Sequence, residues 1–255
     1  MYGKIDGFTV IKWIFKFLVV SIVLLVVGIF LWRFSVGRVP EELCVLSPND
    51  ALADAYSTYG ENLVLYTQDQ NSITRAENNY GYFTSCQVVF IPQANQVQLL
   101  VRYNDSTLKA TEKDYGLAEG SLSYEKDWYD VSLVLMRDKT PDNTEDNLLG
   151  DLGEHRDVIG LERIRPDEVT AAEHHGLHSY RRLVFNNVPL DDTTLAVFAD
   201  FYFAEDMGYL EEGFDIYIDE AYGTLCLYAF TEEKLSFELS KNDETAIREY
   251  IDKRN

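Results

Sequence analysis

The feature that most constrains this chain is an uncharged apolar stretch near its N-terminus. Residues 17–32 read FLVVSIVLLVVGIFLW, sixteen residues without a charged side chain. The stretch continues to Gly37 with Arg33 as its one charged residue, which makes twenty-one residues. A helix needs about 20 apolar residues to cross the hydrocarbon core of a bilayer. The sequence therefore predicts one transmembrane helix over residues 17–37, with the lipid bilayer as its partner.

The charges that flank this stretch suggest an orientation. Lys4, Lys12 and Lys16 precede it, whereas Arg33 and Arg38 follow it and two glutamates come next. Short cytoplasmic segments carry an excess of lysine and arginine. We therefore expect a single-pass protein of the cell membrane with a short cytoplasmic tail at residues 1–16 and an extracytoplasmic C-terminal domain.

A cleaved signal peptide is the alternative interpretation of the same stretch. Ser35-Val36-Gly37 places small residues at the spacing that a signal peptidase accepts. The apolar run is longer than the 7–15 residues typical of such a peptide, and Arg33 lies between the run and that site. The pattern favours a retained anchor.

The rest of the chain is strongly acidic. The whole sequence has 22 Lys+Arg and 43 Asp+Glu, a net charge of −21. Residues 1–37 hold four of the basic residues and one acidic residue, so 18 basic and 42 acidic residues remain, a net of −24. Nucleic-acid binding depends on neutralising phosphates with lysine and arginine, so this balance excludes a nucleic-acid partner. It favours solubility, and it leaves attraction to cations or to a basic partner open.

Alternating apolar and polar residues predict a mainly β domain. Strand patterns with one face in the core are most regular at 129–135, 214–218 and 235–239. Further strand candidates are 63–66, 82–91, 96–103, 179–185, 195–203 and 224–230. About nine strands without interleaved helices predict an antiparallel β-sandwich or open barrel.

Other signals set the boundaries of this domain. Residues 38–46 are predicted to be a juxtamembrane linker, followed by the acidic β-rich domain over residues 47–255. Ser47-Pro48 resembles a helix start, and Asp243 can cap a closing helix. The polar stretch between Asp138 and Arg165 is rich in turn formers and predicts a long surface loop.

This loop is also the first candidate for binding chemistry. Calcium takes six to eight oxygen ligands, so a stretch dense in carboxylates is suitable material. The spacing fits no EF-hand, and a solvated loop without a metal is the simpler expectation. The weak calcium candidates are Asp138, Asp142, Asp146 and Asp151. We expect no other cofactor.

Histidines and cysteines supply the remaining candidates. His174, His175 and His178 are clustered, and two imidazoles four residues apart on a helix can share a metal, although Gly176 weakens a helix there. Cys44, Cys86 and Cys226 make an odd number. The strand cysteines Cys86 and Cys226 could pair across the core or remain as buried free thiols.

One short motif resembles that of sortases, the transpeptidases that attach proteins to Gram-positive cell walls. Thr224-Leu225-Cys226 is similar to the strand-end motif of that family, and the three histidines lie some fifty residues upstream. The layout of an N-terminal anchor before a β domain is also similar. The resemblance implies a cysteine transpeptidase using Cys226 with His174, His175 or His178. The sequence departs from the family in lacking a threonine directly before the cysteine and an arginine after it, where Lys234 stands instead.

The sequence thus leaves two functions of different classes. The favoured hypothesis is an extracytoplasmic binding, scaffolding or envelope-associated protein without catalytic activity, whose protein or envelope partner is unknown. The alternative is the sortase-like enzyme. They differ in whether Cys226 is a reactive thiol or a packed side chain.

Overall fold

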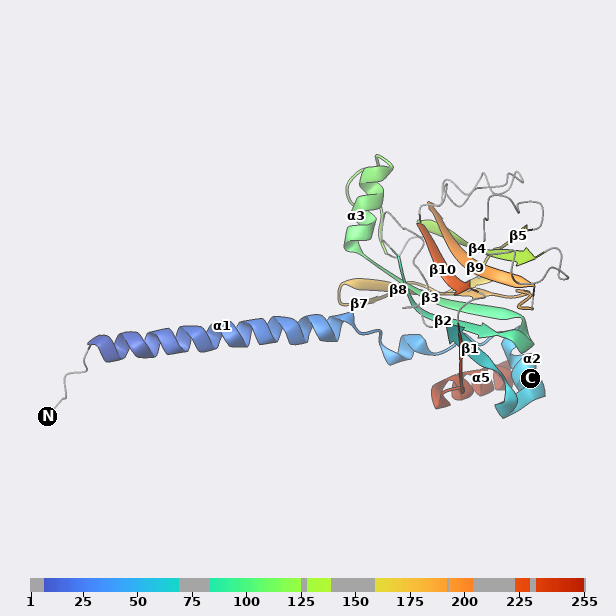
Figure 1. Cartoon of the computed structure of the whole chain (residues 1–255), viewed down its shortest axis with the longest axis horizontal. Helices are drawn as coiled ribbons and strands as arrows, with labels where there is room; N and C mark the ends of the chain where they lie inside the picture. The colour runs from blue at the N-terminus through green and yellow to red at the C-terminus, as the bar shows by residue number, and fades with distance from the viewer. Residues whose placement is uncertain are drawn as a thin grey trace. The chain divides into compact units, whose positions relative to one another are not determined.

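The structure is a computed structural model that describes residues 7–68, 83–124, 128–138, 159–191, 193–203, 223–229 and 233–254. The chain divides into two compact units, Met1–Pro40 and Glu41–Asn255 (Figure 1).

The first unit is dominated by one long apolar helix, α1 (Gly7–Gly37). Its segment Lys12–Phe30 spans 19 residues with a mean hydropathy of 2.7, and none of this segment is buried. The helix is therefore long and apolar enough to cross a membrane.

The second unit is mainly β, and its strands form two antiparallel sheets within the described ranges. Sheet A runs β11 (Lys234–Phe237), β1 (Leu65–Gln68), β2 (Thr84–Ile91), β3 (Gln96–Asn104), β8 (His178–Phe185) and β6 (Glu168–Val169), and β7 (Glu173–His175) also pairs with β8. Sheet B runs β10 (Gly223–Ala229), β9 (Thr194–Phe203), β4 (Tyr129–Asp138) and β5 (Ile159–Ile164). The prediction of a mainly β chain with antiparallel sheets is confirmed.

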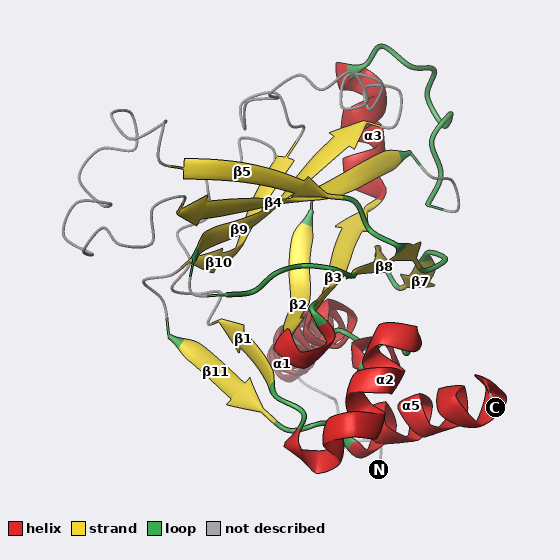
Figure 2. Ribbon diagram, turned by 90° about the vertical axis from the view of Figure 1, so that its right-hand side faces the viewer, coloured by secondary structure: helices red, strands yellow, loops and turns green. Residues whose placement is uncertain are grey.

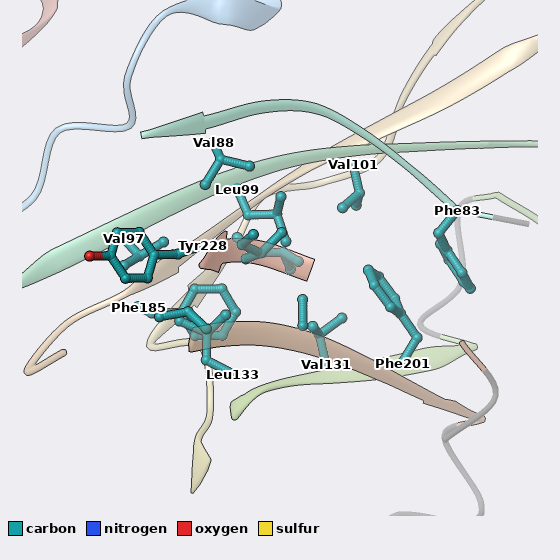
Figure 3. Close-up of a cluster of buried hydrophobic side chains, with 14 of the residues drawn as sticks. Phe83, Val88, Val97, Leu99, Val101, Val131, Leu133, Phe185, Phe201 and Tyr228 are labelled. Carbon is teal, nitrogen blue, oxygen red and sulfur yellow. The ribbon is translucent and has the colours of Figure 1, made fainter. Parts of the chain in front are cut away.

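The main hydrophobic core contains side chains from both sheets (Figure 3). Alternate residues of each central strand point into it, because successive side chains of a strand point to opposite faces. Phe83 stacks on Phe201 with ring centroids 4.2 Å apart, which joins the start of β2 to β9. Other fully buried members are Phe90, Val97, Leu99, Val101, Leu133, Leu135, Phe185, Val197 and Ala199.

A smaller core lies on the opposite face of sheet A. There α2 (Asp50–Tyr59) and α5 (Lys241–Arg254) pack against β1 and β2, as Figure 2 shows. Leu52 from α2 and Ile247 from α5 are both fully buried in this cluster. Sheet A is consequently covered on both faces, by sheet B and by helices.

Both helices begin with side-chain caps, although not at the residues expected from sequence. Asn49, not Ser47, caps α2, and its side-chain oxygen accepts a hydrogen bond from the Leu52 amide. Ser240 and Asp243 bond reciprocally at the start of α5: each side chain accepts a hydrogen bond from the other's backbone amide. The C-terminal helix itself is confirmed.

Several elements depart from the sequence expectations. The helix α3 (Asp105–Asp114) was not predicted, and a capping box of Asn104 and Thr107 starts it. Strand β5 falls inside the stretch predicted as a surface loop, where pairing with β4 stabilises an extended conformation. The predicted strand at 214–218 lies outside the described residues. Short 3-10 helices complete the unit: η1 (Glu41–Cys44), η2 (Gly60–Asn62) and η3 (Pro92–Ala94).

Candidate functional site

A buried carboxylate lies on the face of sheet B that points away from the main core. Ala199 and Phe201 of β9 point into that core, so Asp200 between them points the other way. Asp200 is 0% exposed. Its Oδ1 accepts a hydrogen bond from the Thr224 hydroxyl at 2.8 Å, and its Oδ2 accepts one from the Tyr202 hydroxyl at 3.2 Å.

Arg163 of β5 completes this network. Its Nη1 lies 3.4 Å from Asp200 Oδ2 and donates to the Tyr202 hydroxyl at 2.6 Å. Burial raises the pKa of Asp200 above its ordinary value, while the Thr224 hydrogen bond and the Arg163 charge oppose the rise. Burial together with the negative charge of Asp200 also raises the pKa of Tyr202, to about 12. The groups satisfy one another, which suits a network that holds β5, β9 and β10 in register.

The raised pKa of Asp200 has a measurable consequence. Because the folded state holds this proton more tightly, the carboxyl group contributes stability below the ordinary pKa of 3.8 and loses it as the pH rises through the folded-state pKa. We expect the free energy of unfolding of the wild type, minus that of Asp200→Asn, to fall across this window by up to about 1.4 kcal/mol per pH unit. Denaturant unfolding between pH 3 and 7 measures this.

Asp191 provides a control of opposite sign. Hydrogen bonds from Thr193 and the charge of Arg137 lower the pKa of Asp191, so its contribution is present above 3.8 and is lost as the pH falls through the folded-state pKa. The same difference for Asp191→Asn should therefore rise with pH. A rise for Asp200→Asn as well would show that the ion pair with Arg163 outweighs the burial of the carboxylate.

Cys226 lies on the same face of sheet B as Asp200. It is half-buried in β10 and pairs with Phe198, and its Sγ is 3.6 Å from the Tyr228 carbonyl oxygen, to which the thiol donates. The strand is apolar on both sides in sequence, which predicts a central, covered strand. Among the described strands of sheet B, β10 pairs with β9 alone, and the neighbouring strand predicted at 214–218 lies outside the described residues, so the central position of this strand stays a prediction.

The three candidate histidines lie in sheet A, not in sheet B. His174 and His175 belong to β7 and His178 begins β8. His174 Nδ1 lies 3.1 Å from the Ser179 hydroxyl, and its ring stacks on Tyr124. Burial lowers the pKa of His178, and the charge of Arg102 adds to this. The structure therefore places the members of the sortase-like pair on different sheets.

The calcium candidates fall largely outside the described residues. Asp138 ends β4, and Asp142, Asp146 and Asp151 belong to the stretch 139–158, which is not described. In the described part of the chain, no group of three or more histidine, cysteine, aspartate or glutamate residues could hold a metal ion. A calcium site in this loop stays a prediction.

A second buried polar network lies on the face of sheet A opposite the main core. Gln96 and Gln98 of β3 are both 0% exposed. Gln98 forms two hydrogen bonds with the backbone of Ser47, accepting from its amide and donating to its carbonyl oxygen, each at 2.8 Å. Gln96 donates to Asn49 Oδ1 at 2.9 Å and to Asn186 Oδ1 at 2.7 Å. The glutamines therefore pair with a segment that is not a strand.

Residues 41–49 are the first residues of the second unit, and we call them the entry segment. The Leu46 amide donates to Asp243 Oδ1 at 2.8 Å, and Leu46 is buried. Arg182 of β8 is 4% exposed, and its Nη2 donates to the Leu43 carbonyl oxygen at 2.7 Å. Burial lowers the pKa of Arg182 to about 10. Residues 41–46, assigned to a linker from sequence, are thus hydrogen-bonded to the folded unit.

Sequence reasoning missed Gln96, Gln98, Arg182 and Asp200. The signal was the alternation itself: the polar positions of β3, β8 and β9 were interpreted as solvent-facing, as in a sheet with one wet face. Both sheets instead bury polar residues on the faces away from the main core. Paired hydrogen bonds compensate the cost of removing these groups from water.

Comparison of the chain with protein-family models, with curated proteins and with solved structures found no match.

Proposed function

We propose that this chain is a single-pass, membrane-anchored protein with an extracytoplasmic β-sandwich domain that serves a binding or scaffolding role in the cell envelope. The observation that carries the proposal is α1, whose 19-residue apolar segment has none of its surface buried. Leaving this much apolar surface in water is costly, and a bilayer is the environment that removes the cost.

The way in which the two sheets are covered supports the proposal of a sandwich. Sheets A and B contribute alternate residues to one shared core, and their other faces carry helices or buried polar networks. Two antiparallel sheets that pack face to face in this way form a sandwich.

The entry segment supports a scaffolding role. Backbone groups of Leu43, Leu46 and Ser47 each bond to a buried side chain of the domain. These bonds hold the first residues of the domain on its folded part, which suits a scaffold that presents a constant surface to a partner. A basic protein or envelope polymer is the chemistry that a net charge of −24 favours.

Two features favour binding over catalysis. The Cys226 thiol donates to a carbonyl of its own strand, which stabilises the protonated form and not the nucleophilic thiolate. The Asp200 carboxylate is engaged by three neighbours and lies inside the protein. These described contacts differ from those of an activated nucleophile, which has a base within hydrogen-bond reach.

A protease-protection experiment tests the anchor and its orientation. We expect protease added to intact cells or right-side-out vesicles to remove the acidic domain and to leave a protected fragment that contains residues 17–37. Detergent should abolish the protection, which serves as the control. Full protection of the residues after Val39 would reverse the proposed topology, and a mature N-terminus at Arg38 would show that the helix is a cleaved signal peptide.

A further inference from the structure

Arg182 brings together two chain segments that each carry a cysteine. Its Nη2 donates both to the Leu43 carbonyl oxygen and to Gln87 Oε1, each at 2.7 Å. The two acceptor oxygens are therefore at most about 5.4 Å apart, twice that distance. Cys44 follows Leu43 in the entry segment, and Cys86 precedes Gln87 in β2.

Cys86 occupies an irregular position in its strand. The register between β2 and β3 shifts between Ser85 and Gln87, so Cys86 is the extra residue of a β-bulge. Cys86 is half-buried and lines an open pocket of about 380 Å³ together with Thr67, Gln87, Val88 and Phe237. A small thiol reagent can therefore reach it without unfolding of the sheet.

The hydrogen bonds of Arg182 bring the two cysteine-bearing segments together, and the charges of the two thiols act on one another. Burial raises the pKa of Cys86 to about 11, and a negative charge on Cys44 adds to that rise. The charges of both cysteines also raise the pKa of Tyr180. Arg182 opposes the rise at Cys44, where burial is the main cause, and Arg102 opposes it at Cys86. Burial outweighs both guanidinium charges, so both thiols are protonated at neutral pH and their exchange with another disulfide is slow and accelerates as the pH rises.

We propose that Cys44 and Cys86 are a redox-active pair that closes reversibly into a disulfide and cross-links the entry segment to β2. The oxidant is another disulfide, such as glutathione disulfide or the disulfide of a thiol oxidoreductase. The Cys44 thiolate attacks one sulfur of that disulfide and releases one thiolate. The Cys86 thiolate then attacks Cys44 of the mixed disulfide and releases the second. The two protons lost from the cysteines go to the two released thiols, and the oxidant gains the two electrons.

Cys226 is excluded from this pair by its place in the fold. It lies in sheet B, on the face away from the main core, whereas Cys86 and the entry segment lie on the far face of sheet A. The shared core separates the two positions. The pairing of Cys86 with Cys226 that the sequence allowed is therefore replaced in this proposal by Cys44 with Cys86, and Cys226 lies outside the pair.

The cross-link would stabilise the domain in a way that the hydrogen bonds of the entry segment cannot, because it also constrains the unfolded chain. It would close a loop of about forty residues between positions 44 and 86, and a loop of this size substantially reduces the entropy of the unfolded chain. The attachment of the entry segment would then depend on the redox state of the compartment. This inference goes beyond the proposed binding role and does not depend on membrane anchoring.

The test uses the full-length chain in detergent micelles, equilibrated in buffers of reduced and oxidised glutathione and quenched with acid. Alkylation should label three cysteines under reducing conditions and only Cys226 under oxidising conditions. Mass spectrometry of the unreduced digest should contain a peptide pair joined through Cys44 and Cys86. The melting temperature of the oxidised protein should exceed that of the reduced protein by about 5–10 °C.

Matched variants make the outcome decisive. Cys226→Ser should keep both the cross-linked peptide and the redox-dependent shift in melting temperature, whereas Cys44→Ser and Cys86→Ser should each abolish both. The cross-linked peptide is detected in the wild-type protein itself. This result therefore holds even if one of the variants folds poorly. Only glutathione adducts, or a cross-link through Cys226, would overturn the proposal. So would three labelled cysteines in the oxidised wild type.

Discussion

Replacing Phe201 by alanine is expected to lower the free energy of unfolding by about 3–5 kcal/mol. The ring is fully buried in β9, at the point where the two sheets meet, and it stacks on Phe83 at 4.2 Å. Truncation removes this burial and leaves a cavity that the surrounding strands can fill only in part. A domain has about 5–15 kcal/mol of stability in total, so the loss is a large share. Denaturant unfolding of the chain from Glu41 onward, the second compact unit, measures it.

The matched control is Phe237→Ala. This phenylalanine lies in the end strand β11 and is 39% exposed. We expect a smaller cost of about 1–2 kcal/mol, because part of the ring is already in water and no enclosed cavity forms. Equal costs at the two positions would contradict a core shared between sheets A and B.

Replacing Gln98 by leucine is expected to cost about 2–4 kcal/mol and to release the entry segment. The leucine side chain is of similar size but cannot bond to either backbone group of Ser47 or to Gln96 Oε1. Each buried polar group left without a partner costs about 1–3 kcal/mol. Hydrogen exchange should therefore accelerate at the Ser47 amide by more than tenfold, while the amides of β4 and β9 in sheet B keep their protection.

Gln93→Leu is the control because Gln93 makes the same kinds of bond in an exposed position. Its side chain accepts from the Val64 amide at 3.1 Å and donates to the Asn62 carbonyl oxygen at 3.4 Å. Water can replace both bonds, so we expect a cost within about 0.5 kcal/mol. If Gln98→Leu behaved like Gln93→Leu, the entry segment would be held by the chain around it and not by the buried glutamine.

Local sequence patterns predicted the elements whose stabilising contacts are close in sequence. The apolar run of α1 needs no partner in the chain to be recognised, since its length and hydropathy suffice. The alternations at 129–135, 179–185 and 195–203 correspond to β4, β8 and β9, because a strand with one face in a core must alternate. The C-terminal helix was likewise predicted from the apolar residues on one of its faces and from a polar capping residue at its N-terminus.

The candidate sites were less predictable because they combine residues from distant strands. The sequence offered Cys86 or one of three histidines as a partner of Cys226, whereas the structure places Cys226 in sheet B and these residues in sheet A. Cys44 was treated as part of a linker, and only the hydrogen bonds of Arg182 show that the preceding Leu43 lies near Gln87, which follows Cys86. Asp200 and Gln98 look like solvent-facing positions of half-buried strands until the second covered face of each sheet is known.

The sequence by itself determined that this protein has one apolar helix followed by an acidic, mainly β unit, because periodicity and hydropathy are local properties of the chain. Only the tertiary structure decided which strands share a sheet, as when β1 pairs with β11 more than 160 residues away. It also decided which polar residues are buried. Both outcomes depend on pairing between segments far apart in sequence, and a hydrogen bond from Gln98 to Ser47 leaves no periodic trace in either segment.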